Sequence, residues 1–306
     1  MDQARGNRGL HRFAVFTAVV TFLLIVAGAL VTSNDAGLSV PDWPLSYGGF
    51  TPPMVGNIRY EHSHRLMAGL VLILILILAV WLRRSEPRRW VRWLGYSALI
   101  AVLGQAVLGG ITVLFFLPVP ISVAHACLAQ LVFSLTVVIA NVTSEKWRQL
   151  PPAVAGQDSP SLPQLAVFTA AAIFLQLMMG AAFRHNGFGI VPHLLGAVVV
   201  TTLVMWITYR VVSRHSEQPA LSRPASLLGG LLMLQLLLGG ASYLVLQLTK
   251  DAPQPLPLMV WPTVAHVAGG ALTLASSVWL AVAAHRLLKV SDTRTEAHGG
   301  RVPIST

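Results

Sequence analysis

Four histidines occupy positions where an ionisable side chain is costly to place. They lie one each in four long apolar stretches, within about two helical turns of the stretch's start at 1.5 Å per residue: His64, His125, His193 and His266. An ionisable residue inside a membrane span indicates a functional site by default. Two imidazoles at one depth on facing helices can bind a flat macrocycle from opposite faces, as in helix bundles that hold haem. The spacing therefore predicts two haem sites, one in each half of the chain.

Two other interpretations of these histidines stay open from spacing alone. The imidazoles could form a path for protons or ions, or they could be hydrogen-bonded groups that only pack. A copper or zinc ion would lack ligands, because no carboxylate or thiolate recurs at this depth in both halves. The chain has one cysteine, Cys127, so a thiolate cluster and an intrachain disulfide are both excluded.

One carboxylate stands close to one of these histidines. Glu61 and His64 are three residues apart and share a helix face, whereas His62 points about 200° away from His64. A carboxylate beside a haem suits proton-coupled chemistry, so Glu61 is the candidate catalytic residue. Alternatively, Glu61 is stabilised by the helix dipole or paired with Arg65. No acid precedes His193 in this way, so the two halves are built alike but equipped differently.

The elements that carry these residues are membrane spans. The 306 residues are 55% hydrophobic and 10% charged, with a mean hydropathy of +0.68, whereas a soluble domain carries about 25% charged residues. A helix needs about 20 apolar residues to cross a bilayer. Eight uncharged apolar stretches meet this requirement, at about 13–32, 62–82, 93–117, 119–141, 164–183, 190–209, 225–248 and 260–284. We expect an all-α polytopic membrane protein.

The basic residues orient these spans. Eight spans place both termini on one side, and 17 of the 21 lysines and arginines fall on that side. The other four are Arg59, Arg65, Arg184 and Lys250. Cytoplasmic loops carry an excess of Lys and Arg, so we expect cytoplasmic termini and a location in the plasma (inner) membrane. The net charge of +10 then reflects topology, and no nucleic-acid partner is expected.

A linker divides the spans into two groups of four. Residues 151–163 contain many prolines and no hydrophobic period, which indicates a cytoplasmic linker. It separates an N-terminal half, residues 1–150, from a C-terminal half with a cytoplasmic tail, residues 164–306. An even number of spans in each half makes the halves face the same way.

The halves also share a motif. Gln105 precedes Gly109-Gly110 by four residues, and Gln235 precedes Gly239-Gly240 by four, at an offset of 130 residues. Small residues of this kind let membrane helices approach closely. We therefore expect two pseudo-symmetric four-helix bundles.

Taken together, these motifs resemble the haem A synthase family, the cytochrome oxidase assembly enzymes of bacteria and mitochondria. The resemblance rests on Glu61-x-x-His64-Arg65, on the single histidines of the later even-numbered spans and on the outer loop Gly37–Gly48. It covers roughly residues 13–284. It implies a membrane oxidoreductase that converts the C8 methyl of haem O to the formyl group of haem A, for the assembly of cytochrome c oxidase.

The same resemblance implies a role for each candidate residue. His64 and His125 would bind the substrate, haem O, and Glu61 would be its essential acid. His193 and His266 would ligate a resident cofactor, haem b. All four histidines would then be ligands of haem iron.

The outer loop departs from the family pattern. Many bacterial members carry a cysteine pair there, and this chain has Val40 and Ser46 at the matching positions. This departure speaks against thiol-dependent handling of electrons or haem. Trp43 in the same loop could cover the substrate haem. The candidates to bind the haem propionates are the outer cations, Arg59, Arg65, Arg184 and Lys250. Of these, Lys250 fits better as an anchor that flanks its span.

The expected partners are the lipid bilayer, haem O with the haem O synthase that supplies it, and an electron acceptor of unknown identity; a homo-oligomer is left open. Two rival functions remain. A diheme b-type electron carrier would hold two permanent haems and form no formyl product. A haem-delivery or transport scaffold would hold no haem tightly, and the lack of paired intramembrane carboxylates counts against a coupled transporter.

Overall fold

The computed structural model describes residues 7–156 and 159–290, which are mostly helical. In this part of the chain, eight helices are long and apolar enough to cross a membrane. They are α1 (Arg8–Ser33), α2 (Ile58–Ser85), α3 (Arg89–Leu114), α4 (Val119–Val142), α6 (Leu162–Arg184), α7 (Val191–Arg214), α8 (Pro219–Leu248) and α9 (Pro257–Leu287). The predicted all-α polytopic membrane fold is confirmed.

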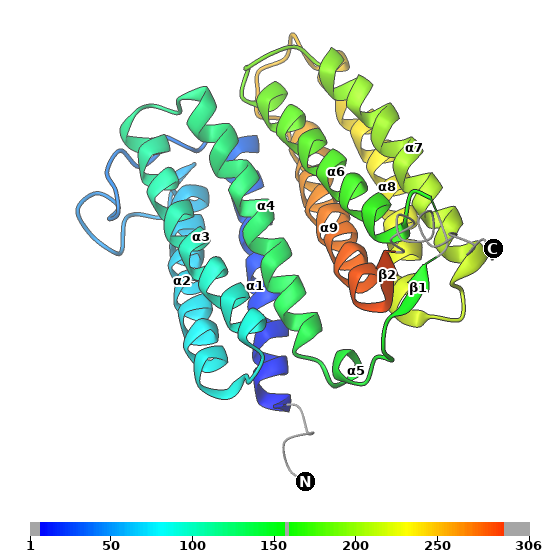
Figure 1. The fold of residues 1–306 in the computed structure, drawn as a ribbon. Coiled ribbons are helices and arrows are strands. Elements are labelled where there is room, and N and C mark those ends of the chain that lie inside the picture. The colour runs from blue at the N-terminus through cyan, green and yellow to red at the C-terminus, as the bar shows by residue number, and fades with distance from the viewer. Residues whose placement is uncertain (1–6, 157–158, 291–306) are drawn as a thin grey trace, which may run out of the picture.

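The eight helices form two groups that lie side by side, α1–α4 and α6–α9 (Figure 1). In each group, consecutive helices pack against one another, and the first helix packs against the fourth. Each group is therefore a four-helix bundle in which the second and fourth helices face each other diagonally. Between the bundles, α9 packs against α1 and α4, and α4 also packs against α6. The predicted symmetry between the bundles stays a prediction.

Local sequence explains where several helices begin and end. α6 starts at a capping box, in which the Ser161 side chain accepts from the Gln164 backbone and the Gln164 side chain accepts from the Ser161 backbone. α3 ends at Leu114, three residues before the end of the predicted span. Phe116 and Leu117 both have a φ of 58°, so a tight reversal in an apolar sequence joins α3 to α4.

Three short elements lie at the end of the molecule where α1 begins (Figure 1). The four-residue helix α5 (Glu145–Arg148) follows α4. Strand β1 (Val154–Gly156) pairs in parallel with β2 (Leu288–Val290). β1 falls within the segment predicted as a linker and ties it to the chain after α9, while the boundaries of the two halves stay predictions.

The apolar core runs through both bundles. Its largest fully buried side chains come from nearly every membrane helix: Leu10, Leu78, Ile139, Leu165, Ile207, Leu228 and Leu280. Other large apolar side chains, such as Phe168, Leu195 and Leu237, are exposed on the outer surface. An exposed apolar surface of this extent suits helices that face lipid rather than water.

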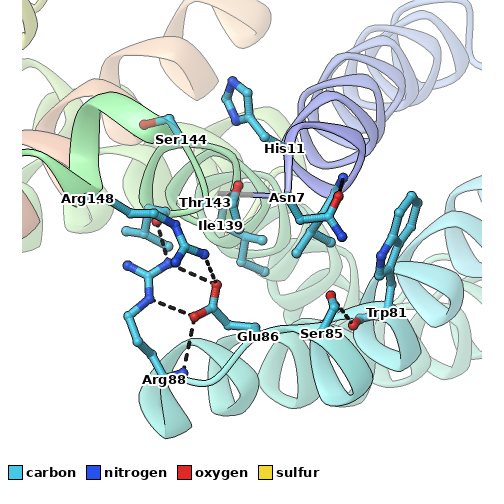
Figure 2. Close-up of polar contacts among 12 residues, drawn as sticks. Asn7, His11, Trp81, Ser85, Glu86, Arg88, Ile139, Thr143, Ser144 and Arg148 are labelled. Atoms are coloured by element: carbon cyan, nitrogen blue, oxygen red, sulfur yellow. Dashed lines mark hydrogen bonds and ion pairs between the residues drawn. The ribbon is translucent and has the colours of Figure 1, made fainter. Parts of the chain in front are cut away.

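A buried carboxylate stabilises the end of the N-terminal bundle near α5. Glu86 has a fully buried side chain and accepts hydrogen bonds from Arg88 Nε (2.7 Å) and Arg148 Nη2 (2.7 Å). Arg88 also donates to the Val142 carbonyl at the end of α4 (2.8 Å). Figure 2 shows the guanidinium groups of Arg88 and Arg148 side by side, both hydrogen-bonded to the Glu86 carboxylate. Burial raises the pKa of Glu86, but the hydrogen bonds and charges of the arginines outweigh it, and the pKa is lowered.

We expect Glu86→Gln to lower the free energy of unfolding by about 1.5–3 kcal/mol at pH 7, the usual contribution of hydrogen bonds to a charged group. Thermal unfolding of the purified protein in detergent measures this. Glu145→Gln is the matched control, because the Arg8–Glu145 pair is exposed at 3.7 Å and such pairs contribute about 0–1 kcal/mol.

The stabilisation by Glu86 should also depend on pH in a defined direction. Because the pKa of Glu86 is lowered in the folded protein, its contribution is present above the ordinary glutamate pKa of about 4.3. The contribution is lost as pH falls through the lowered folded-state value. The difference between Glu86→Gln and the parent should therefore shrink in acid, and equal unfolding midpoints at pH 7 would contradict a stabilising role.

Candidate functional site

Each of the four predicted histidines lies against a glycine on the preceding membrane helix. A Cβ atom added to that glycine would lie closer to Cε1 of the imidazole than an ordinary van der Waals contact. The pairs are Gly28–His64 (3.0 Å), Gly109–His125 (3.2 Å), Gly180–His193 (2.9 Å) and Gly239–His266 (3.0 Å). A side chain at any of these glycines would press on the ring, so the glycines permit the close approach of each helix pair.

The histidines lie on diagonal helices of each bundle. In the C-terminal bundle, the ring centroids of His193 on α7 and His266 on α9 are 6.3 Å apart, with the ring planes at 86°. Two imidazoles on opposite sides of one metal ion would have centroids about 6 Å apart, because each metal–nitrogen bond is about 2 Å long. This pair therefore faces across the bundle centre at a separation that suits a shared iron.

In the N-terminal bundle, His64 on α2 and His125 on α4 occupy the corresponding diagonal helices. The Nδ1 atoms of both rings are buried and have no hydrogen-bond partner among the described residues. Buried polar atoms normally have a partner, so each unpartnered one calls for an explanation. No side chain of the described residues supplies that partner here.

The donor set fits a haem better than a bare metal ion. Within residues 7–156 and 159–290, no three or more His, Cys, Asp or Glu side chains are grouped to hold a metal. Each bundle instead has two imidazoles, which come from its second and fourth helices on opposite sides of the bundle interior. A macrocycle provides the equatorial ligands that such a pair lacks.

Glutamines reach two of these histidines from the preceding helix in the same way. Gln105 on α3 donates to the carbonyl of His125 (2.9 Å). Gln176 on α6 donates to the carbonyl of His193 (2.9 Å), and its amide nitrogen also lies 3.1 Å from Nδ1 of the ring. These contacts fix the position of each histidine along the neighbouring helix.

Gln235 on α8 repeats this contact. With its amide nitrogen facing His266, it donates to the carbonyl (3.1 Å) and to Nδ1 (3.0 Å) of that residue. Sequence comparison of the halves found Gln105 and Gln235 but missed Gln176. Its signal was present, because Gln176 precedes Gly180 by four residues, and a comparison of helix pairs rather than halves would have found it.

Glu61 is buried at the start of α2 and faces the outer loop, residues 34–57. Its Oε2 accepts from the backbone N–H of Val40 (2.8 Å). Its Oε1 forms an ion pair with Arg65 at 2.5 Å. The pairing with Arg65 that the sequence allowed is therefore present, and it leaves Glu61 one helical turn from His64.

Two neighbours of Glu61 also hold the outer loop. Arg65 donates to the carbonyls of Asp42 (2.6 Å), Leu45 (2.5 Å) and Val40 (3.0 Å), so its guanidinium is occupied by the loop. His62 Nδ1 lies 2.9 Å from the hydroxyl of Ser46. The loop is thus fixed on α2 at both positions, 40 and 46, where the sequence lacks the family's cysteines.

Within the loop, Asp42 accepts hydrogen bonds from the backbone N–H groups of Gly48 (2.8 Å) and Tyr47 (2.7 Å). The Gly48 bond, with that of Tyr47, lowers the pKa of the Asp42 carboxyl. The next residue, Trp43, packs on α3: a Cβ atom added to Gly110 would lie 2.8 Å from its ring. Gly110 follows the glycine that contacts His125, so Trp43 lies beside the N-terminal histidine pair.

The remaining outer cations differ in their surroundings. Arg184 on α6 donates to the hydroxyl of Ser33 (2.6 Å) and to the carbonyl of Ala29 (3.3 Å) on α1, and its Nη1 is buried without a partner among the described residues. Arg59 lies 4.9 Å over the Tyr60 ring. Arg184 therefore has a buried donor left to meet an acid group between the bundles.

Comparison with known proteins finds a family match for the first half of the chain. Residues 2–137 match the sequence model of a family described as cytochrome oxidase assembly protein. A heme A synthase of Lysinibacillus sphaericus is 39% identical over 112 residues, 36% of each chain. One of Shouchella clausii is 28% identical over 187 residues, 59% of this chain and 60% of its own. One of Methylobacterium sp. is 32% identical over 154 residues, 46% and 43% respectively.

In each of these relatives, the matched region spans less than two thirds of the protein's length. The family match includes Glu61, His64 and His125, together with the outer loop that covers them. The sequence resemblance to the haem A synthases, a family of cytochrome oxidase assembly proteins, is therefore confirmed, with the family match lying in the N-terminal half of the chain.

Proposed function

We propose that this protein is a haem A synthase, a membrane oxidoreductase that oxidises the C8 methyl of haem O to the formyl group of haem A in cytochrome oxidase assembly. One observation carries the proposal: each bundle places two histidines on diagonal helices, and the bundle that holds Glu61 is the one that matches the assembly family. Two similar haem sites with different surroundings suit one substrate haem and one cofactor haem.

The proposal assigns haem O to His64 and His125, and a resident haem b to His193 and His266. The 6.3 Å separation of the C-terminal rings supports the second site. The placing of His64 and His125 on the diagonal helices α2 and α4, each ring against a glycine of the preceding helix, supports the first. The buried Nη1 of Arg184 is the best placed cation for a propionate.

The residues of the chain have distinct tasks in this scheme. His64 and His125 would hold the macrocycle, and Glu61, one helical turn from His64, would lie near it. The outer loop, held by Arg65 and His62, excludes water from the outer end of the bundle. Glu61 Oε1 and Oε2 can hold or move a proton there. The haem groups supply the redox chemistry, which the protein positions.

A pocket supports access to this site from the side. It has a volume of about 250 Å³ between α1 and α2 and is lined by Ala27, Leu30, Arg59, Tyr60 and Ser63. Ala27 and Ser63 are the neighbours in sequence of Gly28 and His64. An apolar substrate dissolved in the bilayer could approach the histidine here, with its acid groups toward Arg59.

We further propose that the protein lies in the plasma membrane with both termini in the cytoplasm. The charge asymmetry supports this orientation, and so do the basic residues gathered around Glu86 at the end where α1 begins. A haem O synthase would supply the substrate, and a separate acceptor would take the electrons.

The test is expression of the full chain in a membrane that is supplied with haem O, followed by haem extraction and mass analysis. Haem A or a hydroxylated precursor bound beside haem b is the expected result. Haem b alone, in a host that accumulates haem O, would favour the diheme electron carrier. A purified protein without haem would overturn the assignment of both histidine pairs.

A further inference from the structure

The two histidine pairs differ in what holds their rings. In the C-terminal bundle, the residue three positions after each histidine is glycine, Gly196 or Gly269. A Cβ atom at either glycine would overlap a glutamine amide from the preceding helix, Gln176 or Gln235 respectively. The glycines therefore make the space in which each amide reaches its imidazole.

The N-terminal bundle lacks this arrangement. Met67 and Leu128 stand three residues after His64 and His125. Within the described part of the chain, Gln105 reaches only the backbone carbonyl of His125, and Leu24 stands four residues before the glycine that contacts His64. Both N-terminal rings leave Nδ1 without a partner among the described residues.

We propose that Gln176 and Gln235 are positioning residues that lock the C-terminal imidazoles on a permanently bound haem, and that their absence leaves the N-terminal pair free to exchange its haem. The inference rests on the proposed function, which requires one haem to stay and the other to enter and leave. The structure supplies the physical difference between the two sites, which the histidine spacing alone did not.

The chemistry of the contact supports this role. Each amide holds the backbone carbonyl of its histidine (2.9 and 3.1 Å) and lies 3.1 or 3.0 Å from Nδ1. An imidazole that binds metal through Nε2 carries its proton on Nδ1 and donates it to a fixed partner. A glutamine carries both a donor and an acceptor, so a half-turn of the amide presents its oxygen to that proton and gives up the bond to the backbone carbonyl. The oxygen of Gln176 has no other partner among the described residues.

The experiment compares the rate at which purified full-length protein, loaded with haem b, loses that haem to an excess of apomyoglobin. Gln176→Met and Gln235→Met keep the side-chain volume and remove the amide. We expect each to accelerate haem loss by about 10- to 100-fold, as for other partners of metal ligands. The electron paramagnetic resonance signal of the low-spin haem should shift in the same variants.

A second variant reaches the same contact from the other side. Gly269→Ala should displace the Gln235 amide and reproduce the faster loss. Gly240→Ala is its control, because a Cβ atom there meets nothing within 4 Å. Gln105→Met is the control for the glutamines, since its amide contacts only a backbone carbonyl. The Gln235→Met/Gly269→Ala double variant should lose haem no faster than the faster single variant, because both changes remove one interaction.

Unchanged haem loss and an unchanged resonance signal in both glutamine variants would overturn the inference. Equal acceleration by Gln105→Met or Gly240→Ala would do so as well, since it would indicate general loosening of the bundles. A parent protein that binds haem b but never forms haem A would refute the proposed function and leave this comparison intact. A parent that binds no haem b would overturn both.

Discussion

Replacing His266 with alanine is expected to remove the resident haem and all haem A, whereas replacing His64 with alanine is expected to remove haem A alone. The two histidines lie in different bundles, so each substitution leaves the other diagonal pair intact. An imidazole ligand has no substitute nearby, because no third metal-binding side chain joins either pair among the described residues. We expect the affected haem to fall to background in each variant.

The measurement is haem b per mole of purified protein, together with haem A in the membrane by mass analysis. His285→Ala is the control, since this histidine also lies on α9 but, among the described residues, its ring hydrogen-bonds only the Ala281 carbonyl (2.9 Å). If His64→Ala lost haem b and His266→Ala kept it, the assignment of the two haems to the two bundles would be reversed.

Glu61→Gln is expected to reduce haem A formation by about 10²–10⁴-fold, the usual contribution of a residue that transfers protons. The variant should retain resident haem b. Val40 and Arg65 donate to different oxygens of Glu61, and the single amide oxygen of glutamine can keep only one of these contacts. The substitution therefore removes one loop contact together with the ability to take up a proton. The initial rate of haem A formation in isolated membranes measures the effect.

Ser46→Ala separates proton transfer from loop closure. It removes the 2.9 Å contact between His62 and the loop and leaves Glu61 intact, so only a small loss is expected. A Glu61→Gln protein that forms haem A at the parent's rate would show that Glu61 is only a loop anchor. Equal losses in both variants would mean that closure of the loop, rather than a proton, limits the reaction.

The sequence predicted the spans well because hydropathy and charge are local signals. Every predicted stretch has its helix, and the four histidines lie on the even spans as expected. The tight turn at Phe116 and Leu117 was missed, since its positive φ angles occur in residues that normally avoid them.

The outer loop shows why part of the site could not be predicted. The spacing of Glu61 and Arg65 indicated that they could pair. It did not indicate that Arg65 would donate to three carbonyls of the loop. Such contacts join residues 20–25 positions apart in a segment with no periodic pattern. The β1–β2 pair is more distant still, joining Val154 to Leu288, and nothing local indicates it.

The glycines that touch the four histidines have a consequence for the protein before haem arrives. A backbone surface, rather than a flexible side chain, supports each ring, so the distance between each pair of helices is set without a cofactor. Little conformational entropy is then left to lose when haem binds. In the proposed function, haem would therefore enter helix pairs whose spacing is already set, and folding of the chain would not have to wait for it.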